Sequence, residues 1–87
     1  MINLQELKVG DIITGTYDYD ERGSDWFRME GVYYSIVELK YNSDSTIVEG
    51  FRAKVIKKDY DIEAKIGDYI NRHHSTYPEN DCDYVRD

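Results

Sequence analysis

This chain of 87 residues lacks the features that mark several protein classes. It has a single cysteine, which excludes a disulfide within the chain and favours a reducing compartment. It has no apolar run near the roughly 18 residues that a membrane-spanning helix needs. Its N-terminus shows no basic start followed by an apolar stretch, so we expect no signal peptide. These absences predict a cytoplasmic protein that does not enter a membrane.

Large aliphatic and aromatic core residues are also scarce. Valine, isoleucine, leucine and phenylalanine together number 20, and the net charge is −7. Both values lie close to those of chains that fail to fold, so we expect a small core. At this length a folded chain buries roughly 60–65% of its unfolded surface. We predict one compact β-rich domain over residues 1–77, followed by an acidic, mobile tail over residues 78–87.

The apolar pattern predicts a mainly β (α+β) fold. Asn3 and Glu6 have the spacing of a capping box, which indicates one helical turn before the first strand. Strand patterns follow over residues 12–19, 26–41 and 46–58, and residues 42–45 form the strongest hairpin turn. In the long second pattern, which could be one bent strand or two, we place Tyr33, Val37, Leu39 and Tyr41 on one face, with Gly31 as a break in the register. We therefore predict an antiparallel meander or small barrel of three to five strands, with one short C-terminal helix.

Residues 62–73 allow two interpretations. Apolar residues at helical spacing favour a helix, although Gly67 weakens it by roughly 1 kcal/mol relative to alanine. Against the helix, the sequence KIGDYI at residues 65–70 resembles KVGDII at residues 8–13, which reads as a tight turn that leads into a strand. We predict the helix and keep the strand as the alternative.

Acidic residues gather in the expected connections. Residues 1–25 carry six acids and two bases, residues 26–58 four acids and six bases, and residues 59–87 eight acids and three bases. Such a field repels nucleic acid and anionic lipid and attracts basic protein surfaces. We predict that two acidic groups bind a basic partner: Asp18, Asp20, Glu21 and Asp25 form the first, and Asp59, Asp61 and Glu63 the second.

Nine tyrosines make up a tenth of the chain. Tyrosine offers a large contact area with a polar tip and is enriched at protein interfaces. Most of these tyrosines suit core filling and sheet surface in a leucine-poor domain. Tyr19 and Tyr60 adjoin aspartates, so we interpret them as aromatic anchors within the two acidic groups.

No metal-binding or catalytic motif emerges. The stretch that starts at Asp18 is similar to the opening of a calcium loop, but Arg22 and Met29 stand where oxygen ligands are required. His73, His74 and Cys82 provide only three ligands at unsuitable spacing, and the acidic neighbours of Cys82 disfavour a thiolate. We expect Cys82 to be a surface thiol. We predict no enzymatic activity, no cofactor and no metal.

Two other functions remain open. A basic stripe of Arg52, Lys54, Lys57 and Lys58 on the third strand could bind nucleic acid, although the overall charge argues against direct binding. The chain could also be a structural or assembly protein, and an exposed edge strand would allow a homodimer.

Two resemblances bear on these expectations. The segment LQELKVGDIITGT at residues 4–16 resembles the opening of small barrels of the S1, OB and SH3-like kinds, which implies a barrel or a strongly bent sheet. The whole chain is similar in style to small acidic phage-encoded inhibitors of the anti-CRISPR, anti-restriction and DNA-mimic class. That likeness implies a non-enzymatic inhibitor, active in the host cytoplasm, whose acidic surface engages a basic, nucleic-acid-binding surface of a host protein.

Overall fold

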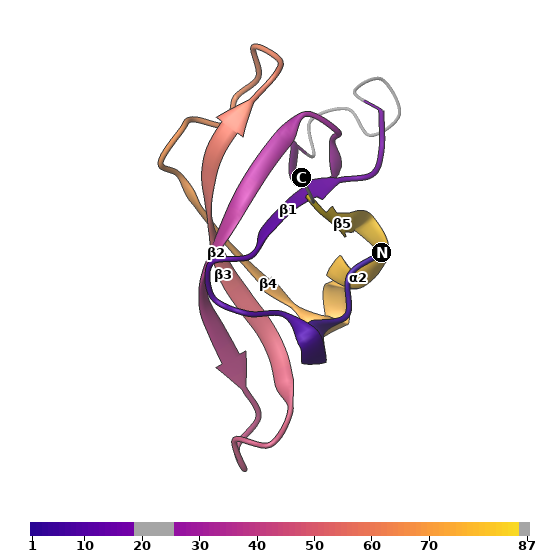
Figure 1. Cartoon of the computed structure of the whole chain (residues 1–87), viewed down its shortest axis with the longest axis vertical. Helices are drawn as coiled ribbons and strands as arrows, with labels where there is room; N and C mark the ends of the chain where they lie inside the picture. Colours follow the sequence, from indigo (N-terminus) through magenta and orange to yellow (C-terminus); the bar gives the residue numbers. More distant parts are fainter. Residues whose placement is uncertain (19–25, 86–87) are drawn as a thin grey trace.

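Five strands and four short helical segments make up the computed structural model, which describes residues 1–18 and 26–85 (Figure 1). The strands are β1 (Ile12–Gly15), β2 (Val32–Tyr41), β3 (Val48–Lys58), β4 (Tyr69–His73) and β5 (Cys82–Tyr84). The helical segments are the 3-10 helices η1 (Leu4–Glu6), η2 (Trp26–Arg28) and η3 (His74–Thr76) and the single α-helical turn α2 (Pro78–Asp81).

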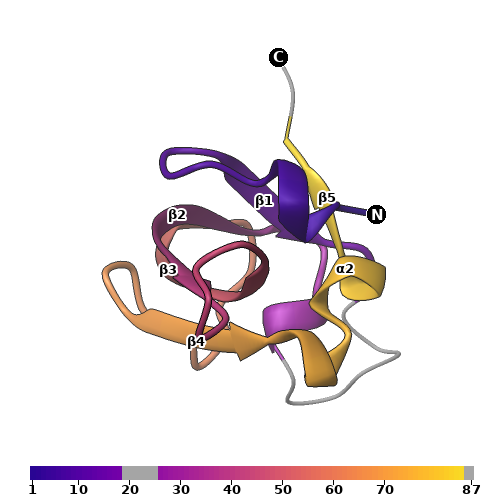
Figure 2. The ribbon, with the colours of Figure 1, turned by 90° about the horizontal axis from the view of Figure 1, so that it is seen from below.

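All strand pairs in the sheet are antiparallel, in the order β4-β3-β2-β1-β5. The predicted mainly β fold with one short C-terminal helix is confirmed, and the sheet does not close into a barrel. Strands β4 and β5 are its two edges. Figure 2 shows the sheet curling between these edges, with α2 and η2 on the open side. No helix within the described ranges has the length and apolar character needed to cross a membrane.

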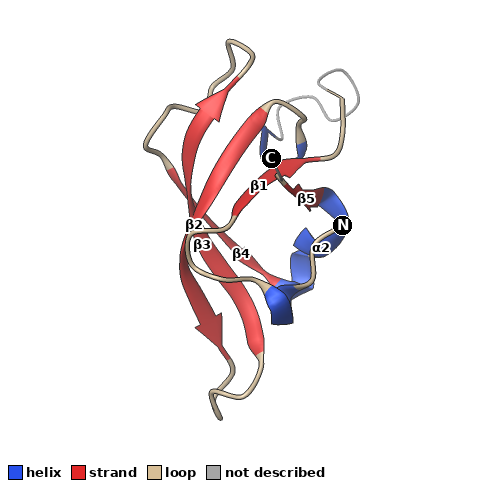
Figure 3. Ribbon diagram, in the orientation of Figure 1, coloured by secondary structure: helices blue, strands red, loops and turns tan. Residues whose placement is uncertain are grey.

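Figures 1 and 3 show the strong curl of the sheet, and the core lies on one of its faces. Side chains that alternate along the two long strands supply most of it, as expected for a sheet with one buried face. Tyr34 and Phe51 are its largest fully buried members, and the Tyr34 hydroxyl donates a hydrogen bond to the Trp26 carbonyl at 3.0 Å. That bond satisfies the only polar atom of a large buried ring.

Several predicted local elements are confirmed. Asn3 accepts a hydrogen bond from the Gln5 amide at 2.9 Å and begins η1. The β2–β3 hairpin turns where Asn42 accepts hydrogen bonds from the amides of Thr46 and Ile47. Here a short polar side chain substitutes for a backbone partner, which is the reason asparagine favours turns.

The predicted strand over residues 26–41 needs two corrections. Residues 26–28 form η2, and β2 begins only after a turn at Gly31. Tyr33 and Val37 do share one face, the outer one, but Leu39 does not share it and packs against the core. The register of β2 against β3 shifts between Ile36 and Glu38, and such a bulge reverses the facing of the residues that follow.

The helix predicted over residues 62–73 is wrong, and the alternative strand is correct. Residues 65–68 form a tight turn that leads into β4, in the same way that residues 8–11 lead into β1. In each turn the aspartate carboxylate accepts a hydrogen bond from the lysine amide, at 2.8 Å for Asp11 and 3.1 Å for Asp68. We call these two segments the twin turns.

The twin turns also contact the sheet in the same way. Gly10 donates its amide to the Ile36 carbonyl at 2.8 Å, and Gly67 donates its amide to the Val55 carbonyl at 2.8 Å. Both glycines have a positive φ, 96° and 98°, which other residues rarely adopt. Ile36 and Val55 each precede a register shift in their strand. The sequence similarity is therefore a structural repeat around the β2–β3 hairpin.

The mobile tail predicted over residues 78–87 is also corrected. Residues 78–81 form α2, and β5 pairs with β1 as the last strand of the sheet. Cys82, expected to be a surface thiol, is fully buried in the core cluster. This segment is held by its pairing with β1, which would otherwise be an open edge, and by the burial of Cys82. Residues 86 and 87 lie outside the described residues.

Candidate acidic binding site

An open hollow of about 420 Å³ lies where β2 begins and β3 ends. Its wall combines carboxylates, phenols and threonine hydroxyls, and none of its lining residues within 1–18 and 26–85 is a lysine or arginine. The lining residues are Thr14, Gly15, Thr16, Glu30, Gly31, Tyr33, Asp59, Tyr60 and Asp83. We call it the acidic hollow. It draws on β1, on the turn before β2, on the end of β3 and on β5.

Gly31 shapes the floor of the acidic hollow. The Asp59 amide donates a hydrogen bond to the Gly31 carbonyl at 2.7 Å, which extends the β2–β3 ladder by one residue. The Tyr60 ring then lies directly over Gly31, since a Cβ added there would be 2.7 Å from the ring. Two features favour glycine at position 31: the close contact with the Tyr60 ring and the positive φ of 89°. Any side chain at this position would displace Tyr60, which is 47% exposed.

The electrostatics of the hollow are negative. Burial raises the pKa of Tyr33, and the Asp59 carboxylate raises it further, by its charge and by accepting the phenol hydrogen bond at 3.2 Å. Glu30 and Tyr60 add to this rise in the Tyr33 pKa. Burial disfavours a charged phenolate, and neighbouring carboxylates disfavour it again. Tyr33 is therefore held as a neutral donor.

Cations of the chain itself already contact the rim. Lys57 Nζ lies 3.8 Å from the Asp59 carboxylate and 5.1 Å from the centre of the Tyr33 ring. The Asp83 carboxylate pairs with the amino group of Met1. No described residue forms an ion pair with Glu30. The hollow thus contains the combination of carboxylate and aromatic ring that favours a cation.

The structure brings together only part of the predicted site. Asp59 and Tyr60 line the hollow, whereas Asp61 and Glu63 lie exposed on the following loop. Asp18 is exposed next to Tyr17, whose carbonyl accepts a hydrogen bond from the Glu30 amide at 2.7 Å. Four predicted residues lie outside the described part of the chain: Tyr19, Asp20, Glu21 and Asp25.

The sequence interpretation missed Glu30, Tyr33 and Asp83. Glu30 precedes a glycine that forms a turn, and this local signal could have placed it beside Gly31. Asp83 could not have been found, because its position depends on the pairing of β5 with β1, opposite Thr14. Long-range pairing of this kind leaves no local pattern in the sequence.

The proposed basic stripe loses one residue in the fold. Lys58 donates hydrogen bonds to the carbonyls of Ile62 and Ala64 at 3.2 and 2.8 Å and so anchors the loop that carries Asp61. Lys57 lies at the rim of the acidic hollow. Arg52 and Lys54 lie farther along β3, towards β4. Only Lys58 is therefore removed from the predicted stripe, while Arg52, Lys54 and Lys57 remain on the outer face of β3.

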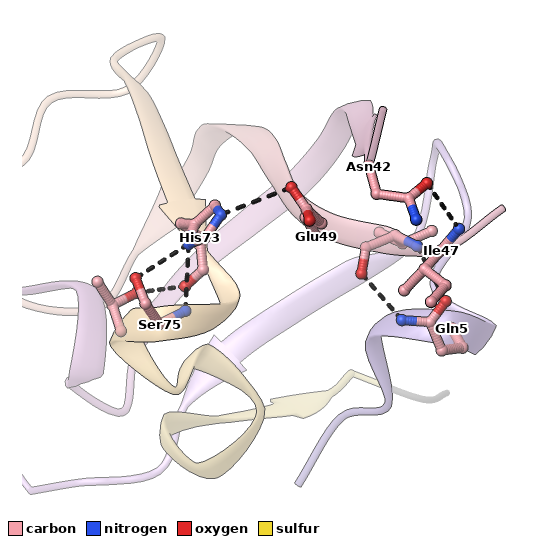
Figure 4. A network of polar contacts seen from close by, with 8 residues as sticks. Gln5, Asn42, Ile47, Glu49, His73 and Ser75 are labelled. Carbon is pink, nitrogen blue, oxygen red and sulfur yellow. Dashed lines mark hydrogen bonds and ion pairs between the residues drawn. The ribbon is translucent and has the colours of Figure 1, made fainter. Parts of the chain in front are cut away.

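A row of polar side chains at the other end of β3 has the residue types of a hydrolase site (Figure 4). His73 Nδ1 lies 2.9 Å from Ser75 Oγ, and His73 Nε2 lies 3.8 Å from Glu49. The same Nδ1 accepts the Ser75 amide at 3.2 Å, which makes His73 the N-terminal cap of η3. The contacts of His73 are thus those of a helix cap, and none of His73, Ser75 and Glu49 lines the acidic hollow.

Among the described residues, no three histidine, cysteine, aspartate or glutamate side chains are close enough to hold a metal ion. No family model, no curated protein and no solved structure matches this chain.

Proposed function

We propose that this protein is a non-enzymatic binding module of the cytoplasm whose acidic hollow receives basic side chains of a partner protein. The partner surface is one that normally binds nucleic acid, because such surfaces present lysines and arginines for phosphate groups. The protein then acts as an inhibitor that competes with nucleic acid for those side chains.

One observation carries this proposal: three carboxylates and two phenols from separate parts of the chain converge on one hollow. Carboxylates accept charge-assisted hydrogen bonds from a guanidinium, and an aromatic ring stacks on its face. A partly enclosed surface strengthens these interactions relative to open water. Lys57 between Asp59 and the Tyr33 ring illustrates the same chemistry within the chain.

The first test measures the affinity for an oligo-arginine peptide. We expect Glu30→Gln and Asp59→Asn each to weaken binding about tenfold, because loss of a charged partner in an interface costs at least about 1.4 kcal/mol. The matched control is Asp44→Asn in the β2–β3 hairpin, at the far end of the molecule (Figure 1). It changes the net charge equally and should leave the affinity unchanged. If all three variants lose the same affinity, the loss reflects the change in net charge alone, and the acidic hollow is not the binding site.

The second test uses the Tyr33 phenol as a probe of the hollow. A cation bound beside Asp59 offsets the carboxylates that raise the Tyr33 pKa, whereas added burial under the peptide raises that pKa further. We therefore expect peptide binding to shift the Tyr33 pKa, and to lower it where the charge of the cation outweighs the added burial. Ultraviolet titration of the phenol measures this change, with Tyr33→Phe identifying the signal. An unchanged Tyr33 pKa at saturating peptide would place the peptide elsewhere.

The competitive mechanism is tested with a purified nucleic-acid-binding protein and labelled duplex DNA. Wild-type protein should displace the DNA, and the Glu30→Gln, Asp59→Asn double variant should displace much less. The matched control is the double variant Glu38→Gln, Asp44→Asn, which also removes two negative charges from exposed positions. If the double variant displaces DNA as well as the wild type, the acidic hollow is not the competing surface.

A further inference from the structure

Strand β4 presents an open edge of the sheet. It pairs with β3 on one side only, whereas β1 lies between two strands. Val55 donates its amide to the Asp68 carbonyl at 2.8 Å, and backbone groups of successive residues alternate in direction along an antiparallel strand. The backbone groups of Tyr69 and Asn71 therefore point away from β3. No described residue forms a hydrogen bond with these outward groups.

Cationic side chains lie beside this edge on the outer face of the sheet. Lys40 Nζ, from β2, reaches across β3 and donates a hydrogen bond to the Asn71 side chain at 3.1 Å. The Arg52 guanidinium lies 4.2 Å above the ring of Tyr69, which is 48% exposed. Lys54 is the direct cross-strand neighbour of Tyr69. The outer face next to β4 therefore differs in charge from the acidic hollow.

We propose that the β4 edge binds an extended, acidic segment of a partner protein as a sixth strand of the sheet. An added strand would lie about 4.8 Å from β4, with alternate side chains on the outer face. Carboxylates at those positions come within reach of Lys40 and Arg52. The backbone groups of Tyr69 and Asn71 provide the hydrogen bonds, and the cations select the acidic sequence.

A second copy of this chain fits the edge poorly. If two β4 strands paired antiparallel around Asn71, Lys40 and Arg52 of both copies would lie close together at the new interface. Like charges across adjacent strands are destabilising, and cations beside an edge are a recognised barrier to self-association. Charge complementarity therefore favours a different, acidic chain.

The test uses a short capped peptide of alternating glutamate and valine as the probe. We expect the peptide to protect the Tyr69 and Asn71 amides from hydrogen exchange, as followed by NMR. Asn71→Pro removes an outward donor and should weaken binding about tenfold. Lys40→Gln with Arg52→Gln should weaken it several-fold. A peptide that alternates lysine and valine should not bind.

A second measurement does not depend on how the proline variant folds. The wild-type protein is titrated with the same glutamate–valine peptide carrying N-methyl groups on the amides that would face β4, and we expect binding to be lost. Unchanged affinity of this peptide, or no protection of the two amides, would overturn the proposal. A dimer that Asn71→Pro abolishes would also overturn it, by assigning the edge to a second copy.

The Glu30→Gln variant separates this proposal from the acidic hollow. It should bind the glutamate–valine peptide with wild-type affinity while losing affinity for oligo-arginine. A parallel loss of both peptides would show that the β4 edge is not an independent site.

Discussion

The twin turns at residues 8–11 and 65–68 share a sequence pattern and a backbone path, yet they lead to strands in different surroundings. Strand β1 is bonded to β2 on one side and to β5 on the other, and β4 is bonded to β3 alone. Thr14 and Asn71 occupy equivalent places after the two turns. The Thr14 backbone groups face β5, as the flanking hydrogen bonds from Val85 to Ile12 and from Thr16 to Asp81 require.

This difference shows that a local sequence pattern specifies the turn and the direction of its strand. It does not specify what lies on the strand's other side. The four predictions below test the comparison, beginning with the largest expected effect.

Proline at the two equivalent positions should have the most unequal effects. Thr14→Pro removes a ladder hydrogen bond from an interior strand and should cost about 3 kcal/mol or more. Asn71→Pro removes an amide that faces away from β3, and edge positions of this kind tolerate proline. Urea denaturation compares the two free energies of unfolding. If both proline variants lower the free energy of unfolding equally, the outer edge of β4 must be hydrogen-bonded, as both edges of β1 are.

Valine in place of either turn glycine should destabilise both turns. A side chain at positive φ costs about 1–2 kcal/mol, and a β-branched residue costs more. We expect Gly10→Val to lower the global stability, because β1 joins β2 to β5. Gly67→Val should act mainly on β4 and raise its hydrogen exchange. A global effect of Gly67→Val that equals that of Gly10→Val would contradict the distinction.

Removal of the turn carboxylates should have smaller and similar effects. Asp11→Ala and Asp68→Ala each delete one hydrogen bond to a lysine amide, which contributes about 0.5–1.5 kcal/mol. The two losses should add in the double variant because the turns lie on opposite sides of the β2–β3 hairpin. Thermal unfolding measures them, and strong non-additivity would indicate direct coupling between the turns.

The smallest effects are expected at the second position of each turn. Val9 is 63% exposed and Ile66 is 58% exposed, so neither side chain contributes much to the core. Val9→Lys and Ile66→Lys should each change the stability by no more than about 0.5 kcal/mol. A larger loss at one position only would reveal a contact that distinguishes the two turns.

The sequence predicts the fold best where the interacting residues are close together along the chain. The Asn3 cap and the Asn42 hairpin follow from residues close together in the chain, and both are present. The predicted helix over residues 62–73 is wrong because Gly67 adopts a positive φ and donates its amide to Val55, so residues 65–68 form a turn. Leu39 faces the core, opposite to Tyr33 and Val37, because of a bulge that depends on the partner strand.

The candidate site shows the same limit. Asp59 and Tyr60 could be predicted as an aromatic anchor beside an acid, since they are adjacent in the sequence. Glu30 and Asp83 join them only after β2, β3, β1 and β5 have assembled. The predicted role of Asp18, Asp20, Glu21 and Asp25 stays a prediction.

By itself, the sequence determined the turns, the hairpin, the sign of the charge and the mainly β class, because each follows from propensities of neighbouring residues. Only the tertiary structure decided that residues 82–84 complete the sheet, that three distant carboxylates surround one hollow and that β4 is left as an open edge. These outcomes depend on which strand edges pair. Backbone hydrogen bonds are nearly identical for every residue type, so the choice of partner is made by the packing of the whole core.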